Sequence, residues 1–209
     1  MNISHTIAQK LLEIEAVKLS PAEPYKWSSG WLSPIYCDNR LTLSYPPVRH
    51  LIKTAFVDVV HTHFKDAEAI AGVATAGIPQ GALVADAMNI PLIYVRPKPK
   101  DHGMENLIEG KLIQGQKVVV LEDLVSTGGS SLKAVEALRE AGAVVLGMVC
   151  IFTYGFDVAT RQFADAKVKL CPLCNYDTLM EICVSSQKFT ENELAALKDW
   201  RHAPDSWGR

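Results

Sequence analysis

The sequence predicts an α/β fold with an open, mainly parallel central sheet that is flanked by helices. Short apolar segments typical of buried strands alternate with segments whose apolar residues recur at helical spacing. Hydrophobic residues make up 48% of the 209 residues, enough for a substantial core. Strands that are separated by helices run parallel and have both faces covered. No linker or internal repeat divides the sequence, so residues 1–209 are expected to form one domain.

The segment before this alternation contains two predicted helices and an irregular stretch. Residues 3–17 carry an amphipathic pattern, and residues 47–61 carry the clearest helical stripe, with Pro47 suited to a first helical turn. Residues 21–39 are rich in Pro, Ser, Gly and aromatic residues, which predicts short strands and turns. The N- and C-terminal segments are expected to pack around the sheet as an accessory subdomain.

The alternation of strands and helices begins near residue 69. Apolar runs predict strands at residues 69–73, 91–95, 117–121 and 143–152, and a further one at 167–171. Helical spacing predicts helices at residues 77–88 and 130–141, the second closed by Gly142. Residues 98–110 are polar and contain glycine, so a loop is expected there. Thr190 and Glu193 form a capping box that begins the last helix.

Charge, hydropathy and cysteine content exclude several classes of protein. The formal net charge of −2 provides no basic footprint for generic nucleic-acid binding. No apolar run of about 18 residues is present, so no membrane span is expected. Residues 1–17 lack a signal-peptide pattern, and five scattered cysteines fit a reducing compartment, so a cytoplasmic location is expected.

The most informative stretch is residues 118–131, VVVLEDLVSTGGSS. An apolar run enters two acids, Glu122 and Asp123, and a turn rich in Ser, Thr and Gly then leads into a helix. Open parallel sheets bind ligands beyond the carboxyl ends of their strands, and the unpaired N–H groups of a helix start favour an anion. Glycines let the backbone approach a ligand closely, and carboxylates accept hydrogen bonds from vicinal hydroxyls. The pattern indicates a site for a sugar that carries a phosphate.

An ordinary turn between a strand and a helix could have the same composition. The adjacent acids favour the functional interpretation, because burying two carboxylates without partners is costly. The stretch contains neither of the commoner phosphate-binding patterns, G-x-x-x-x-G-K-[ST] and G-x-G-x-x-G.

Residues 118–131 are similar to the phosphoribosyl diphosphate (PRPP) signature of type I phosphoribosyltransferases, and the resemblance covers roughly residues 70–152. Three further stretches resemble the orotate phosphoribosyltransferase family: SGWLSPIY at 29–36, GVATAGIP at 72–79 and RPKPKDHG at 96–103. The resemblance implies the type I phosphoribosyltransferase fold, with a small hood over the base from about residues 1–45 and a PRPP-binding core at about 65–155. It also implies transfer of the phosphoribosyl group of PRPP to orotate, giving orotidine 5′-monophosphate and diphosphate in de novo pyrimidine biosynthesis.

The same resemblance assigns roles to individual residues. Glu122 and Asp123 would hold the ribose hydroxyls, and the residues that follow would hold the 5′-phosphate: Leu124, Val125, Ser126, Thr127, Gly128, Gly129 and Ser130. Ser126 would also reach orotate. The diphosphate would meet Arg96, Lys100 and His102, so the implied catalytic residues are Lys100, His102 and Asp123. Cations on a closing loop act mainly in the transition state, because charge builds on the leaving group as the C–O bond breaks.

The resemblance implies Mg²⁺ as the cofactor, held mainly through PRPP rather than by a protein metal site. It implies a homodimer in which the 98–110 loop is shared across the subunits. PRPP and orotate are the expected partners, with no nucleic acid and no membrane. Two alternatives stay open: a type I phosphoribosyltransferase for another base, and a PRPP-sensing regulator that binds nucleic acid.

Four positions depart from the pattern of the orotate family, in which cations often stand there: Ser28, Ala76, Pro97 and Tyr154. Several cationic contacts to the base or the diphosphate are therefore expected to be missing in this chain or supplied from elsewhere.

Two other groups favour a structural interpretation. Arg40 could meet a carboxylate ligand, but an ion pair with Asp38 or another acid is favoured. Cys171 and Cys174 form a lone C-x-x-C pair, and a structural zinc site needs four ligands, so a packing role is expected.

Overall fold

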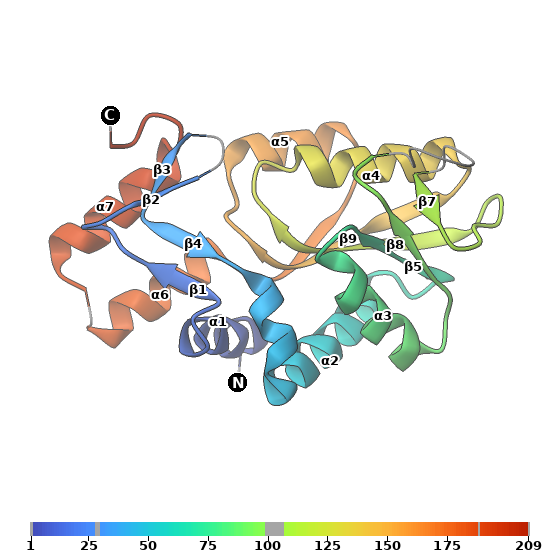
Figure 1. Ribbon diagram of the computed structural model, residues 1–209, viewed down its shortest axis with the longest axis horizontal. Helices are drawn as coiled ribbons and strands as arrows, with labels where there is room; N and C mark the ends of the chain where they lie inside the picture. Colours follow the sequence, from blue (N-terminus) through green and yellow to red (C-terminus); the bar gives the residue numbers. More distant parts are fainter. Residues whose placement is uncertain (1, 28–29, 99–106, 188, 209) are drawn as a thin grey trace.

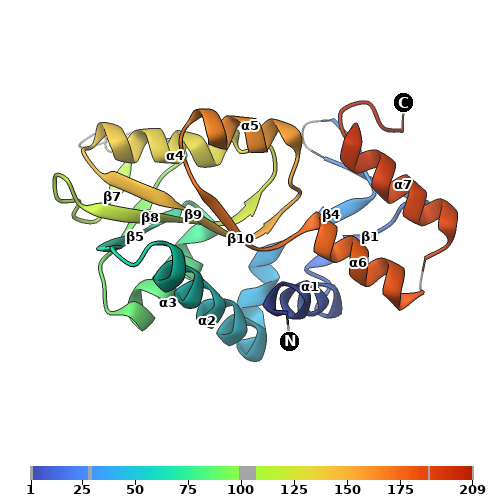
Figure 2. The same ribbon diagram turned by 180° about the vertical axis from the view of Figure 1, so that it is seen from behind.

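A six-stranded sheet forms the centre of the protein in the computed structural model, which describes residues 2–27, 30–98, 107–187 and 189–208. Its strand order is β10 (Leu170–Asn175), β9 (Val144–Thr153), β8 (Lys117–Val125), β5 (Ala69–Val73), β6 (Leu92–Val95) and β7 (Ile108–Glu109). Figures 1 and 2 show the sheet between two layers of helices, from the front and from behind. The first five run parallel, and β7 pairs antiparallel with β6. The prediction of an open, mainly parallel sheet is confirmed.

Helices cover both faces of this sheet, which is why its central strands are continuously apolar. Helices α2 (Pro46–His63) and α3 (Gly77–Met88) lie on one face, and α4 (Gly129–Glu140) and α5 (Asp157–Asp165) lie on the other (Figure 1). The apolar run of β8, residues 118–121, is fully buried between them. No helix in the described part of the chain is both long enough and apolar enough to cross a membrane.

Both ends of α4 depend on glycine. Gly128 precedes the helix with a φ of 89°, and Gly142 follows it with a φ of 90°, a conformation that residues with a Cβ rarely adopt. The amide of Gly142 donates to the carbonyl of Arg139, and the amide of Ala143 donates to that of Leu138, so the chain leaves the helix with its last carbonyls satisfied. The predicted helix stop at Gly142 is confirmed.

The N-terminal strands lie against the C-terminal helices. After α1 (Ile3–Glu13), strand β1 (Val17–Leu19) pairs with β4 (Ile35–Cys37), β2 (Tyr25–Lys26) pairs with β3 (Leu32–Ser33), and the 3₁₀ helix η1 (Asn39–Ser44) follows. Figure 1 shows these strands beside α6 (Tyr176–Ser186) and α7 (Glu191–His202). The fully buried Trp200 of α7 contacts the rings of Trp27, Tyr154, Phe156 and Tyr176. The two ends of the chain therefore pack together through one aromatic cluster.

Several predicted boundaries were wrong. Helix α1 ends at Glu13 rather than at residue 17, because Glu15 turns the chain with a φ of 57° and β1 then pairs with β4. The predicted loop 98–110 includes β7, whose Ile108 pairs with Val95. The strand predicted at 167–171 is shifted to Leu170–Asn175, since Lys167 takes a φ of 53°. Helices α5 and α6 were not predicted.

Candidate functional site

The two acids lie inside β8 rather than just beyond it. Glu122 pairs with Cys150 of β9, and the ladder continues to Val125, so the predicted strand end at residue 121 was four residues too early. Glu122 is 7% exposed and Asp123 is half-buried. The predicted phosphate-binding segment is correspondingly shorter as a loop: Leu124 and Val125 belong to the strand, and only Ser126, Thr127 and Gly128 form the turn before α4.

Three hydrogen bonds fix the positions of Glu122 and Asp123. The Glu122 carboxylate accepts from the Asp123 amide at 3.0 Å and from the Ser131 hydroxyl at 3.4 Å. The side-chain amide of Asn39 donates to the Asp123 carbonyl at 2.8 Å. Asn39 is 1% exposed, and it ties η1 to the strand that carries both acids. Sequence reasoning missed Asn39, although it stands beside Asp38 and Arg40, which drew attention for their charge.

Burial raises the pKa of both carboxyl groups above the ordinary range. For Glu122 the negative charge of Asp123 raises the pKa further, and the two carboxyl groups also share a hydrogen bond. The positive charge of Arg40 lowers the pKa of Asp123 only in part, because Arg40 is already paired: its Nε and a terminal nitrogen donate to Asp38 at 2.6 and 2.8 Å. The predicted Arg40–Asp38 ion pair is confirmed. Carboxyl oxygens keep acceptor capacity in either protonation state, so the pair can accept hydrogen bonds from a ligand with two hydroxyls.

The turn after β8 ends at a helix start that is suited to an anion. Gly128 has the positive φ that the turn requires, and in the described chain no side chain caps α4. The first N–H groups of a helix have no intrahelical acceptor, and the helix dipole adds positive potential there. Ser126, Thr127 and Ser130 bring hydroxyl groups to the same place, and none of the three is fully buried.

Two pockets meet at this turn. One of about 710 Å³ is lined by Lys26, Trp27, Trp31, Tyr36, Cys37, Leu124, Ser126, Thr127 and Tyr154. The other, of about 660 Å³, lies between the ends of β5 and β6 and the start of α4, and its lining includes Ala74, Arg96, Gly129, Ser130 and Lys133. The turn and the start of α4 thus line both pockets: the turn residues Ser126 and Thr127 line the first, and Gly129 and Ser130, the first residues of α4, line the second.

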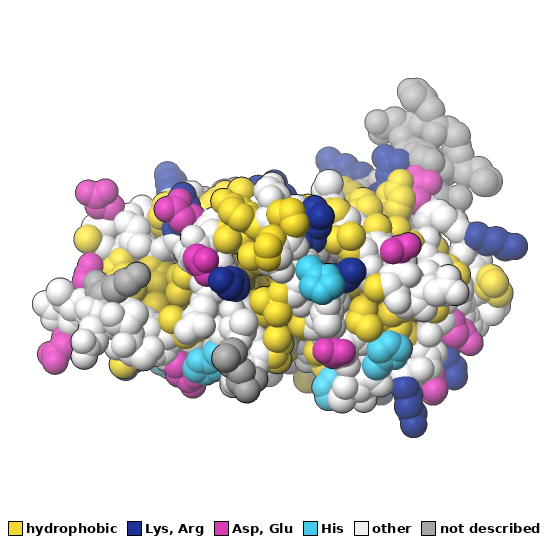
Figure 3. All heavy atoms as spheres, turned by 90° about the horizontal axis from the view of Figure 1, so that it is seen from below, with side chains coloured by type: hydrophobic (Ala, Val, Ile, Leu, Met, Phe, Trp, Pro, Cys, Tyr) yellow, Lys and Arg dark blue, Asp and Glu magenta, His cyan; other side chains and the backbone are white. Residues whose placement is uncertain are grey.

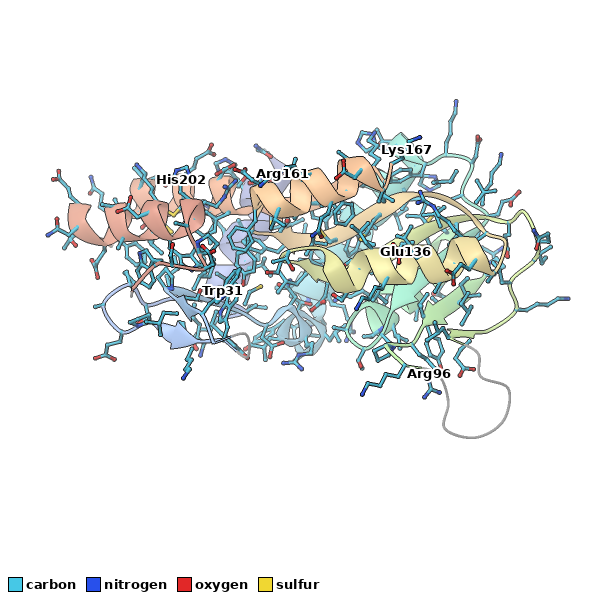
Figure 4. The ribbon with its side chains drawn as sticks, turned by 90° about the horizontal axis from the view of Figure 1, so that it is seen from above. Trp31, Arg96, Glu136, Arg161, Lys167 and His202 are labelled. Carbon is cyan, nitrogen blue, oxygen red and sulfur yellow. The ribbon has the colours of Figure 1, made fainter. Side chains whose placement is uncertain are left out.

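Arg96 follows β6 and lines the second pocket. Its guanidinium lies 3.3 Å from a carboxylate oxygen of Glu109 on β7, and about a third of its side chain is exposed. Figure 4 shows Arg96 and Trp31 at well-separated places along the molecule, with Glu136 marking α4. Lys100 and His102 lie outside the described residues, as does Ser28, so the structure does not place them.

The glycines of residues 72–79 are required by packing. A Cβ on Gly77 would lie 2.5 Å from the Leu121 carbonyl oxygen, and one on Gly72 would lie 2.8 Å from the Gly77 carbonyl oxygen. These contacts seat the β5–α3 turn directly against β8. Ala74 is the member of the turn that lines the second pocket together with Val73.

Tyr154 and Cys174 are buried and contact other core residues. Tyr154 is 2% exposed and stacks on Phe156 at 5.4 Å, so a ring cluster occupies the place where the orotate family often has a cation. The buried Cys174 thiol donates to the Ile151 carbonyl at 3.3 Å. Among the described residues no group of three or more His, Cys, Asp or Glu could hold a metal ion.

Comparison with known proteins identifies the family of this chain. A phosphoribosyl transferase domain matches residues 45–184 of the chain. The orotate phosphoribosyltransferase of Cytophaga hutchinsonii is 59% identical over 207 residues, which cover 99% of each chain. The chain belongs to the orotate phosphoribosyltransferase family.

Solved structures place this family member among proteins of the same fold. The orotate phosphoribosyltransferase of Aeropyrum pernix superposes with a TM-score of 0.76 at 30% identity, over 86% of this chain and 98% of that one. The UMP synthase of Leishmania donovani superposes with a TM-score of 0.79 at 28% identity, over 95% of this chain but 42% of that longer one. The predicted family and fold are confirmed.

Proposed function

We propose that this protein transfers the phosphoribosyl group of PRPP to orotate, giving orotidine 5′-monophosphate and diphosphate in pyrimidine biosynthesis. The observation that supports this most strongly is the acid pair of β8, which runs into a turn shared by two pockets, in a chain that matches orotate phosphoribosyltransferases along its whole length. The reaction needs two adjacent pockets, because the base approaches C1′ of the ribose from the side opposite the departing diphosphate.

The ribose half of the site consists of Glu122, Asp123 and the β8–α4 turn. In our proposal the carboxylates accept hydrogen bonds from the ribose hydroxyls, and the turn with the start of α4 holds the 5′-phosphate. Asn39 is a positioning residue in this proposal: its hydrogen bond to the Asp123 carbonyl fixes the strand that carries the acids, and its side chain takes no part in the reaction. Asp123 is the more exposed acid and the one in contact with the ligand.

The diphosphate half contains Arg96, and we propose Lys100 and His102 as its further cations. Each stabilises the charge that develops on the leaving oxygen as the C1′–O bond breaks. Mg²⁺, if bound, would be held mainly through PRPP and would supply positive charge against the departing diphosphate; the described residues offer it no cluster of three or more ligands. The electron pair of the broken C1′–O bond leaves with the diphosphate, a ring nitrogen of orotate forms the new bond to C1′, and the proton of that nitrogen passes to the departing diphosphate or to water, so no protein nucleophile is needed.

The base half is the aromatic pocket between the N-terminal strands and the turn. Trp27, Trp31, Tyr36 and Tyr154 offer flat apolar surfaces for a planar pyrimidine, and the Ser126 hydroxyl offers a hydrogen bond at its edge. We propose that the N-terminal strands act as the hood over the base. In the same proposal the enzyme is a cytoplasmic homodimer in which residues 98–110 reach the neighbouring subunit's site.

The test is a turnover assay with a choice of bases. The protein is mixed with PRPP, Mg²⁺ and orotate, the loss of orotate absorbance is followed, and diphosphate is measured in parallel. The amount of orotate lost is expected to equal the amount of diphosphate formed. Uracil, adenine and hypoxanthine serve as alternative bases in matched reactions; consumption of one of these in place of orotate would refute the proposal.

A PRPP-sensing regulator would behave differently in the same experiment. It would give no product from any base and would bind nucleic acid with an affinity that falls as salt rises. Acidic and basic side chains are interspersed on the face that Figure 3 shows, and the net charge is −2, so the surface offers little support for that alternative.

A further inference from the structure

The aromatic pocket has one charged residue in its lining. Of the nine lining residues, Lys26 alone carries a charge, and the others are aromatic, aliphatic, hydroxyl or thiol side chains. Orotate differs from uracil by a carboxylate on the ring. A carboxylate that enters such an apolar pocket without a cation loses its hydration uncompensated, which costs far more than burial of the ring itself gains.

Lys26 is available for this carboxylate. It lies on β2, opposite Leu32 of β3, and its side chain is exposed. Among the described residues it makes no ion pair, in contrast to Lys18 on the neighbouring β1, which lies 3.0 Å from Glu15. Arg40, the other cation near this end of the site, is bound at two nitrogens by Asp38.

The positions from which the family often supplies cations to the base cannot do so here. Ser28 is uncharged, and Tyr154 is a buried member of the ring cluster. Lys26 lies on β2, two residues before Ser28 in the sequence, and lines the same pocket. The side chain of a lysine is long and flexible enough to bring its ammonium group to the edge of a bound ring.

We propose that Lys26 pairs with the carboxylate of the pyrimidine and thereby determines specificity for orotate over uracil. This inference rests on the proposed function. The Ser126 hydroxyl and the Lys26 ammonium, both from the lining of one pocket, then fix the base at two points. Fixing the ring at two points also limits the orientations that its reacting nitrogen can take toward C1′.

The experiment compares two nucleotides that differ only in the carboxylate. Binding of orotidine 5′-monophosphate and of uridine 5′-monophosphate is measured by calorimetry for the parent protein, Lys26→Met and Lys26→Arg, with Lys18→Met as the matched surface control. Loss of one charge-assisted hydrogen bond predicts that Lys26→Met binds orotidine 5′-monophosphate about ten- to a hundredfold more weakly. Its affinity for uridine 5′-monophosphate stays unchanged, Lys26→Arg keeps most of the preference, and Lys18→Met matches the parent.

Kinetics provide the second measurement. In Lys26→Met the KM for orotate rises while the KM for PRPP stays within about twofold, because the ribose half of the site is intact. Equal weakening of both nucleotides, or of neither, would overturn the inference and would assign Lys26 a packing role or none. Failure of the parent protein to convert orotate at all would instead overturn the proposed function, so the two failures are distinguishable.

Discussion

Replacing Gly128 by alanine perturbs the β8–α4 turn at a single atom. Gly128 has a φ of 89°, and a residue with a Cβ pays about 1–2 kcal/mol to adopt a left-handed conformation. The new Cβ would also lie 2.9 Å from Cε2 of Phe163, a ring that is 3% exposed and held in the core. Such overpacking costs about 1–3 kcal/mol, so the free energy of unfolding should fall by about 2–5 kcal/mol in total.

The control is the neighbouring glycine. A Cβ on Gly129 meets no atom within 4 Å, and Gly129 is the first residue of α4, where alanine is the better helix former by about 0.5–1 kcal/mol. Chemical denaturation of both variants, monitored by circular dichroism, measures the difference. Gly129→Ala should be as stable as the parent or slightly more so, and Gly128→Ala should be less stable. Gly128→Ala should in addition show a raised KM for PRPP, because its turn is distorted. Equal stability of the two variants would refute the reasoning.

Three further predictions concern the acids and the loop. Lys100→Ala should lower kcat on the order of a hundred- to a thousandfold while PRPP binding is largely retained, as expected for a cation that acts in the transition state; an unchanged kcat in steady-state assays would exclude this role. Asn39→Ala removes the bond to the Asp123 carbonyl and should cost about 1–3 kcal/mol of stability and raise the KM for PRPP, and parent-like kinetics would contradict the positioning role. The raised pKa of Glu122 makes the protonated form the favoured one in the folded protein. The resulting stability is fully present below the ordinary carboxyl pKa of 4.5 and is lost as pH rises through the folded value of about 9. Unfolding free energies across this window should therefore fall with pH in the parent and fall less steeply in Glu122→Gln; parallel curves would show that the shift is absent.

The features that could be predicted from the sequence are those whose signal is local. The central strands are buried on both faces and so appear as uninterrupted apolar runs, and Gly142 marks the end of α4 because the turn needs its positive φ. The same rule predicted the end of β8 too early. Glu122 and Asp123 interrupt the apolar run, although their backbone continues to pair with β9. An acid in the interior of a buried strand breaks the local rule at the place where we propose the ligand site.

Contacts between distant parts of the chain could not be predicted in this way. Asn39 reaches Asp123 across 84 residues, and nothing in either neighbourhood indicates the other. The aromatic pocket likewise combines the β2–β3 pair with the β8–α4 turn, so its lining depends on how the N-terminal strands pack on Trp200. The resemblance to a family identified three members of this lining as site residues, Leu124, Ser126 and Thr127, whereas Lys26 required the fold.

We propose that Glu122, Asp123 and the β8–α4 turn hold the ribose 5-phosphate, while separate residues hold the diphosphate. Calorimetric titration of ribose 5-phosphate, and separately of diphosphate with Mg²⁺, into the parent and into Asp123→Asn tests it most directly. Loss of a hydrogen bond to a charged acceptor predicts that Asp123→Asn binds ribose 5-phosphate about tenfold or more weakly and binds diphosphate as the parent does. Unchanged affinity for ribose 5-phosphate, or equal weakening of both ligands, would contradict the assignment.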